Sequence, residues 1–342
     1  MTASAGHVNV LDAYYLSITL LVTIGYQLSF FAVAWTFKFD KVTDFAGGTN
    51  FFWLALMTLL LGGINRANDA RNIVASVLVM VWALRLSGFL LFRILKSGSD
   101  TRFDDKRNNF FKFLGFWVFQ MFWVWTVSMP LTILNSPKIM ATGSVGFGTA
   151  RDIVGIVFFA IGFFVEAIAD QSKYMFKKKH PKAFCNVGVW AWSRHPNYFG
   201  EIFLWWGIWM LCLSPSTNGP VRGSGYAAQY ASIVGPVFIT LLLFGVSGLP
   251  LQEEPTQKKM YKSDKRDAYA TYLNSTSIVV PFPPPLYRPL PTFIKRSVLL
   301  DFPFYQYDPS KDQDAQDDEQ ERGSSHQGTR QSTENLHNGS DE

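Results

Sequence analysis

A run of polar and charged residues interrupts the otherwise apolar central part of the chain. It extends from Ser193 to Glu201 (SRHPNYFGE) and places Arg194 and His195 directly before Pro196. Proline is favoured in the first turn of a helix, so a helix is predicted to start there, with Asn197 and Glu201 on one face. The arginine and the histidine offer positive charge and hydrogen-bond donors that suit phosphate groups.

A second polar run ends the apolar segment that precedes this one. Glu166 and Asp170 lie four residues apart, and Lys173 and Lys177 continue along the same helical face. The lysines suit phosphate, whereas Asp170, Glu201 and the later Glu253-Glu254 pair offer acceptors for ribose hydroxyls or an amide. Together the two runs predict a site for a nucleotide.

Membrane-spanning helices must position these residues. The chain is 48% hydrophobic and only 17% charged, whereas a soluble domain is typically about one-quarter charged. A helix needs roughly 20 mostly apolar residues to cross the hydrocarbon core of a bilayer. Seven such segments predict an all-α polytopic bundle. They lie near Leu11–Phe37, Phe45–Ile64, Ile73–Leu95, Phe110–Leu134, Ile153–Ala169, Tyr198–Leu213 and Tyr230–Leu249.

The distribution of basic residues predicts the orientation of the bundle. Lys38 and Lys41 follow the first segment, and six basic residues lie in each of the stretches 93–112 and 173–194. The loops that alternate with these hold at most two. Since cytosolic loops carry the excess of lysine and arginine, we expect the N-terminus outside or in the lumen and the C-terminus in the cytosol. Both polar runs would then reach the cytosolic rim.

Arg85 is the one basic residue predicted to lie near the middle of a span. A charged side chain at that depth is costly. Arg85 is therefore either functional or paired with a polar group on a neighbouring helix. The two cysteines, Cys185 and Cys212, have no metal-site spacing and are expected to be buried. We predict no metal site.

The C-terminal region has a different composition. Six prolines among residues 281–291 favour an extended chain, which could bind a proline-reading module or pack along the membrane face. Residues 308–342 carry ten acidic and three basic side chains and almost no apolar ones, which predicts disorder. We divide the chain into N-terminal spans (1–70), a membrane domain with the cofactor site (71–291), a C-terminal strap (292–307) and an acidic tail (308–342).

The SRHPNYFGE run resembles the hallmark of membrane proteins related to the steroid 5-alpha-reductases, and it is most similar to their subgroup of unknown function. The similarity extends over roughly residues 70 to 285. It includes the stretch from Arg93 to Phe103, with Gly98, Asp100 and Arg102, and the segment from Ala169 to Lys177. Ser247-Gly248-Leu249-Pro250, the Tyr269-Ala270-Thr271-Tyr272 stretch and Val280-Pro281-Phe282 resemble the C-terminal part of the family.

The resemblance implies a cytosol-facing NADPH site and reduction of a carbon–carbon double bond in a steroid-like or other lipid substrate. Lys173 and Lys177 match basic cofactor contacts of the sterol reductases. Asp170, Asn197 and Glu201 match polar cofactor contacts of the steroid reductases. Tyr198 and Glu201 are the expected catalytic residues. The full set of expected cofactor contacts is Asp170, Lys173, Lys177, Trp190, Arg194, His195, Asn197, Tyr198, Glu201, Glu254 and Tyr272.

Two other functions stay open. The Arg-His-Pro-x-Tyr run, the Glu-Glu pair and the later Tyr-x-x-Tyr also resemble membrane methyltransferases of prenylated proteins and phospholipids, which use S-adenosylmethionine. A transporter or scaffold would explain the spans but not the polar residues at one rim. We expect membrane lipids and a lipid-like substrate as partners, and no nucleic acid. The family suggests the endoplasmic reticulum, and the oligomeric state is not predicted.

Overall fold

The computed structural model describes residues 10–62, 70–97, 108–143 and 145–311. Among these residues all regular elements are helices, apart from two isolated bridges, Val10 with Asp12 and Ser193 with Ser277. The all-α prediction is therefore confirmed. Gly98, Asp100 and Arg102 of the expected family stretch lie outside the described residues, as does the acidic tail from residue 312 onward.

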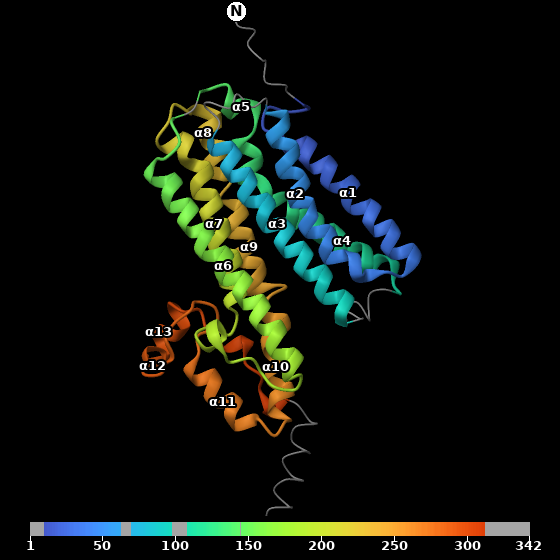
Figure 1. Cartoon of the computed structure of the whole chain (residues 1–342), viewed down its shortest axis with the longest axis vertical. Coiled ribbons are helices and arrows are strands. Elements are labelled where there is room, and N and C mark those ends of the chain that lie inside the picture. Colours follow the sequence, from blue (N-terminus) through green and yellow to red (C-terminus); the bar gives the residue numbers. More distant parts are fainter. Residues whose placement is uncertain (1–9, 63–69, 98–107, 144, 312–342) are drawn as a thin grey trace, which may run out of the picture. The chain divides into compact units, whose positions relative to one another are not determined.

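Long helices form most of the chain (Figure 1). They are α1 (Leu16–Phe37), α2 (Thr43–Leu61), α3 (Ala70–Ser97), α4 (Phe110–Leu134), α6 (Ala150–Lys179) and α7 (Pro196–Thr217). Shorter helices are α5 (Pro137–Met140), α8 (Gly223–Ala231), α9 (Val234–Gly245), α10 (Leu249–Tyr261), α11 (Arg266–Ser275), α12 (Pro284–Tyr287) and α13 (Thr292–Ser297).

A helix occupies each of the seven predicted spans, but within the described part of the chain six helical stretches are both long and apolar enough to cross a membrane. These are α1, α2, α3, α4 with its continuation to Met140, α6, and the stretch Gly223–Tyr261 that contains α9. The remaining predicted span, the sixth in chain order, corresponds to α7. This helix is 22 residues long but begins with polar residues, since Asn197 and Glu201 lie in its first turns. The chain is a multi-pass membrane protein, and the orientation of its termini stays a prediction.

The chain forms two compact units. Unit 1 contains Met1–Lys178 and Pro196–Leu242, and unit 2 contains Lys179–His195 and Leu243–Glu342. In unit 1, α2 packs against α1, α3 and α4, and α7 packs against α3 and α4. In unit 2, α11 packs against α10 and α12. The sequence-based division at residues 70, 291 and 307 stays a prediction.

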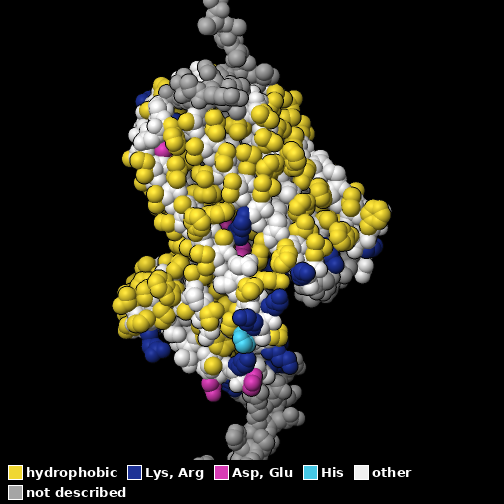
Figure 2. Space-filling view, in the orientation of Figure 1, with side chains coloured by type: hydrophobic (Ala, Val, Ile, Leu, Met, Phe, Trp, Pro, Cys, Tyr) yellow, Lys and Arg dark blue, Asp and Glu magenta, His cyan; other side chains and the backbone are white. Residues whose placement is uncertain are grey.

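The outer surface of unit 1 is apolar. Large hydrophobic side chains are exposed on α1, α3, α4 and α6, including Leu21, Leu84, Phe122, Ile153 and Phe164. Figure 2 shows hydrophobic side chains covering most of the visible face of these helices. An apolar surface of this extent is expected where helices face lipid.

Glycines bring α6 and α7 into close contact within unit 1. Gly155 and Gly162 on α6 lie against Gly207 and Gly200 on α7, respectively. A Cβ atom on Gly162 would lie 2.5 Å from the carbonyl oxygen of Gly200, and a Cβ atom on Gly155 would lie 2.7 Å from that of Gly207. Small residues let helix backbones approach closely in a membrane, where the hydrophobic effect does not drive helices together. The pairing also fixes an antiparallel register between α6 and α7.

Gly162→Val is expected to lower the melting temperature of the detergent-purified protein, because the added side chain would have to separate α6 from α7. Overpacking of this kind typically costs about 1–3 kcal/mol. Gly115→Ala is the matched control, since Gly115 lies inside α4 with no atom within 4 Å of an added Cβ. Thermal unfolding of both variants tests the contact. Equal melting temperatures for the two variants would contradict it.

Candidate active site

Two arginine–carboxylate pairs connect α3 to α6 within unit 1. Arg71 pairs with Asp152, and Arg85 pairs with Glu166. Within each helix the two partners are 14 residues apart (71 to 85 and 152 to 166), which corresponds to about 21 Å along the helix axis. The rings of Phe92 and Tyr174 meet at nearly the same offset, 82 residues (174 − 92) instead of 81 (152 − 71 and 166 − 85). The two helices therefore run in parallel, and their charged pairs lie at two levels of the bundle.

The first pair is fully buried and saturated with hydrogen bonds. Arg71 donates from Nε to Oδ1 of Asp152 (2.7 Å) and from Nη2 to Oδ2 (2.8 Å), and it also donates to the carbonyls of Val145 and Gly146. Asp152 Oδ2 accepts from the backbone N–H groups of Gly148 and Thr149, both at 2.9 Å. Since the charged groups already satisfy one another, we interpret this pair as structural.

The second pair is incompletely satisfied. Arg85 forms an ion pair with Glu166 and donates from Nη1 to Asp170 Oδ2 at 2.7 Å. Glu166 Oε2 also accepts from Trp82 Nε1 at 3.0 Å. Within the described part of the chain, Arg85 Nε is buried without a hydrogen-bond partner, although 18% of the side chain is exposed. The sequence-based alternative that Arg85 pairs with a neighbouring helix is confirmed.

Helix α7 adds a third carboxylate to this cluster. Gly200 packs against the backbone and Cβ of Glu166, and Glu201 follows Gly200. Glu201 is close enough to Asp170 and Arg85 to interact electrostatically with both. We define the acidic cluster of unit 1 as Glu166, Asp170 and Glu201. Arg85 interacts with all three carboxylates, and Arg93 and Lys173 also interact electrostatically with Asp170. Such a group of carboxylates suits a bound group that brings hydrogen-bond donors.

Asn197 extends the acceptor side of the cluster. The antiparallel register set by Gly162 and Gly200, continued by one helical turn, brings Asn197 level with Val165 and Glu166. Its Oδ1 atom is buried and has no hydrogen-bond partner among the described residues. A buried acceptor without a donor is costly. This second observation, independent of the charges, also indicates a ligand that donates hydrogen bonds.

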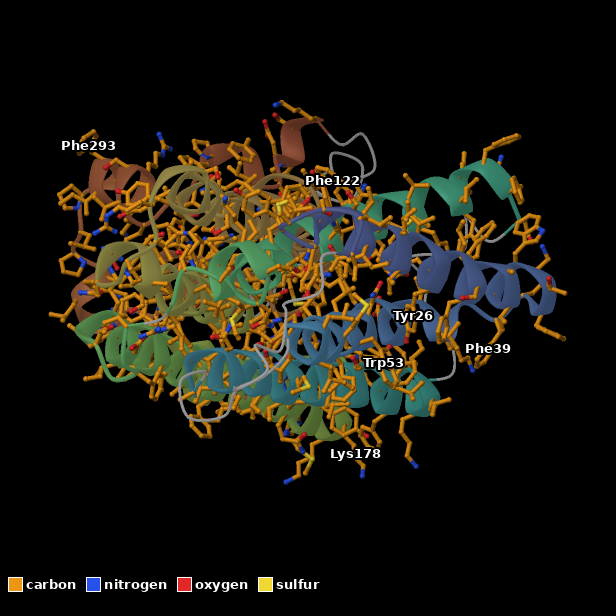
Figure 3. All side chains as sticks on the ribbon, turned by 90° about the horizontal axis from the view of Figure 1, so that it is seen from above. Tyr26, Phe39, Trp53, Phe122, Lys178 and Phe293 are labelled. Carbon is orange, nitrogen blue, oxygen red and sulfur yellow. The ribbon has the colours of Figure 1, made fainter. Side chains whose placement is uncertain are left out.

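The predicted basic contacts of unit 1 lie at the end of α6. Lys173 interacts electrostatically with Asp170, three residues before it, and Lys177 follows one turn later. Both side chains are half-buried, as is Tyr198 in the first turn of α7. Lys178 differs, since it is exposed and points away from the helices in Figure 3. Asp170, Lys173, Lys177, Asn197, Tyr198 and Glu201 therefore all belong to the α6 and α7 part of unit 1.

Unit 2 holds the other predicted residues, and its backbone fixes the start of the SRHPNYFGE run. The N–H of Arg194 donates to the carbonyl of Ser277 (2.8 Å) and the N–H of His195 to that of Ile278 (3.0 Å). The hydroxyl of Ser193 donates to the carbonyl of Val279 at 2.7 Å. These bonds tie the segment before α7 to the chain that follows α11.

The side chains of Arg194 and His195 are held by carboxylates. Arg194 donates to Glu253 and to Asp301, each at 2.7 Å, and His195 Nε2 lies 2.7 Å from the other oxygen of Glu253. Burial alone would lower the pKa of Arg194, but the charges of Glu253 and Asp301 raise it above its ordinary value. Arg194 is therefore a permanently charged, internally paired group within unit 2.

The remaining predicted contacts of unit 2 differ in their surroundings. The hydroxyl of Tyr272 donates to the carbonyl of Trp190 at 2.6 Å. Burial raises the pKa of Tyr272, so its hydroxyl stays protonated at neutral pH. Glu254 is exposed. Its neighbour Glu253, which the sequence had offered only as half of a pair, makes the contacts to Arg194 and His195.

Sequence reasoning missed Asp301, Gln257 and Tyr287 as partners of this group. Gln257 donates to Glu253 at 2.8 Å, one helical turn away on α10, and Tyr287 donates to Asp301 at 2.8 Å. The i, i+4 spacing of Glu253 and Gln257 was a usable signal. Asp301 had none, since it lies 107 residues from Arg194. It follows Leu300, whose positive φ of 58° turns the chain at that point.

Glu253→Gln is expected to destabilise unit 2, because Arg194 would lose one of two buried carboxylate partners. Breaking a buried ion pair on one side costs about 3–5 kcal/mol. Glu254→Gln is the matched control, since the adjacent side chain is exposed and should leave stability almost unchanged. Thermal unfolding with limited proteolysis of the detergent-purified variants measures both. A larger loss for Glu254→Gln would show that the buried partner has been misassigned.

One comparison with known proteins finds a match. A family model described as a protein of unknown function (DUF1295) matches residues 30–276, which is more than half of the chain. No match is found among curated proteins or among solved structures. The matched range begins within α1 and includes the acidic cluster, Asn197 and the whole SRHPNYFGE run. This chain belongs to the DUF1295 family.

Proposed function

We propose that the protein is an NADPH-dependent reductase of a carbon–carbon double bond in a lipid-like substrate. The cofactor would bind to α3, α6 and α7 of unit 1. The observation that supports this most strongly is the gathering of acceptors there. Glu166, Asp170 and Glu201 lie around Arg85, and Asn197 Oδ1 is buried with no donor among the described residues.

The residues present fit the chemistry of this cofactor. NADPH carries donors in its carboxamide and ribose hydroxyls, which match Asp170, Asn197 and Glu201. It also carries phosphates, which match the ammonium groups of Lys173 and Lys177 at the end of α6. An apolar bundle with a few convergent polar groups is the usual setting for a small-molecule site.

When bound, NADPH would supply a hydride to an electron-poor carbon. The chain must then provide a proton or polarise the substrate. Tyr198, in the first turn of α7, would act as proton donor, and Glu201 would hold the polar part of the ligand one turn further along. The apolar helices around them would exclude water from the reaction. A lipid-like substrate could reach the bundle from the bilayer.

Family membership supports the same proposal. The DUF1295 family is related to the steroid 5-alpha-reductases, and the residues that carry the resemblance lie in the matched range. Because many endoplasmic reticulum enzymes act on lipids within the membrane, that compartment suits the proposal. Membrane lipids would then be both solvent and source of substrate.

An S-adenosylmethionine-dependent methyltransferase is the alternative. Its motif residues Arg194, Glu253 and Tyr269 are close together in unit 2, where Arg194 contacts Glu253 directly. That contact favours the alternative by joining two of its motifs. It also leaves Glu253 engaged with Arg194, His195 and Gln257, so it offers few free acceptors to an ammonium group. For this reason we prefer the reductase.

Ligand-induced stabilisation distinguishes the two functions. We expect NADPH to raise the melting temperature of the detergent-purified protein and S-adenosylmethionine to have no effect. Binding to the folded state alone contributes about 2.7 kcal/mol when the ligand is at 100 times its Kd. Asp170→Asn and Asn197→Ala should reduce the shift. Lys182→Ala should not, since Lys182 is exposed and lies outside unit 1.

The melting temperature of each variant without ligand separates loss of binding from loss of folding. A shift with S-adenosylmethionine alone would overturn the reductase in favour of the methyltransferase. No shift with either ligand would favour a transporter or scaffold.

A further inference from the structure

We propose that the C-terminal segment from Pro281 to Leu300 is a membrane-surface anchor. It would insert its exposed apolar side chains into the interface of a bilayer and pair its basic side chains with anionic lipid headgroups. The segment contains α12 and α13 and lies beyond residue 276, where the family match ends. The proposal concerns unit 2 alone and does not depend on the nucleotide site.

The first observation is an exposed apolar surface within unit 2. Leu286 is 60% exposed, Phe293 77% and Val298 66%. Figure 2 shows a patch of hydrophobic side chains over α12 and α13, with basic side chains at its edge. In Figure 3 the side chain of Phe293 points outward from α13. Large apolar side chains rarely gather on a surface that faces only water.

The second observation is the positive charge of this segment. Residues 281–300 contain three basic residues, Arg288, Lys295 and Arg296, and no acidic ones. The next acidic residue, Asp301, is engaged by Arg194 and Tyr287. A short segment that combines exposed aromatic and aliphatic side chains with basic groups is typical of proteins that lie in the membrane interface.

The third observation is that the segment is already ordered against unit 2. Tyr287 and Leu299 are buried, and Lys295 lies over the ring of Tyr287 at 4.5 Å. Lys295 also donates to the carbonyl of Arg288 at 3.3 Å. A segment with its inner face fixed loses little further freedom when the outer face enters lipid.

The bilayer is the partner that we propose for this surface, because the same chain spans a membrane. Unit 2 is joined to the membrane-spanning unit by three chain crossings, at 178–179, 195–196 and 242–243. Because these connections tether unit 2 to a membrane-spanning unit, no recruitment is needed for unit 2 to meet lipid, whereas a protein partner would have to be recruited. The positive charge of the segment matches the anionic lipids of a cytosolic leaflet, the side on which the C-terminal region is predicted to lie.

Site-specific fluorescence tests the proposal on the full chain. Cys185 and Cys212, both buried, would be replaced by alanine, and Phe293→Cys would be labelled with an environment-sensitive dye. Asn274→Cys on α11 is the matched control, since Asn274 is exposed in the same unit. Both proteins would be reconstituted in nanodiscs that contain brominated lipids.

We expect brominated lipid to quench the dye at position 293 at least about twofold more than the dye at position 274, as for an inserted side chain. Adding phosphatidylserine to phosphatidylcholine should increase the quenching. Arg288→Gln with Arg296→Gln should abolish that increase. Equal quenching at both positions would overturn the proposal. So would a position 293 dye that is shielded in detergent but unquenched in lipid, which would indicate a protein partner. Ligand-free melting temperatures verify that each labelled protein is folded.

Discussion

The arrangement of this protein depends on the pairing of buried charges between α3 and α6. An uncompensated arginine in an apolar bundle is costly, so the two arginines of α3 that lie within the bundle, Arg71 and Arg85, each require a carboxylate at the matching level of α6. Arg71 and Arg85 meet Asp152 and Glu166 in the same register. The two pairs fix the axial and the rotational position of α3 relative to α6. The glycine contacts of α6 with α7 then place α7 against this pair of helices.

The two levels differ in a way that separates structure from function. At the first level every charged atom of Arg71 and Asp152 has a partner, so nothing remains to be offered to a ligand. At the second level Arg85 interacts with all three carboxylates of the acidic cluster, and Asn197 contributes a buried acceptor that no described residue supplies with a donor. The same helices thus carry one fully hydrogen-bonded ion pair, Arg71 with Asp152, and one incompletely hydrogen-bonded group around Arg85. Donors from a bound ligand would lower the free energy of the folded protein at the second group.

The sequence predicted the helices well because long apolar stretches leave the backbone no alternative in lipid. It also predicted that Arg85 would need a partner and that Glu166 and Asp170 share a face. The span count was less successful, since α7 combines helical length with polar ends. The sequence could not show which of Glu253 and Glu254 contacts Arg194, because adjacent residues on a helix point in different directions and only the folded chain shows what lies there. Asp301 was beyond prediction, since only the folded chain brings it to Arg194.

Within unit 2, the motif residues Arg194 and His195 have a structural role. Arg194 and His195 are tied by Glu253 and Asp301, so within their own unit they order the chain that leads into α7. The C-terminal segment contributes to this order through Asp301 and Tyr287. A motif shared by a family can therefore serve partly to hold a helix entrance in place, while neighbouring side chains supply the contacts to a ligand.

A structure of the purified protein determined by electron cryomicroscopy with saturating NADPH tests the central claim most directly. The account predicts density for the nicotinamide and its ribose next to α3, α6 and α7, within hydrogen-bond distance of Asp170, Asn197 and Glu201. Density for the cofactor at any site remote from these three side chains would contradict the account. So would an unchanged cluster with no bound cofactor at a concentration that saturates related reductases.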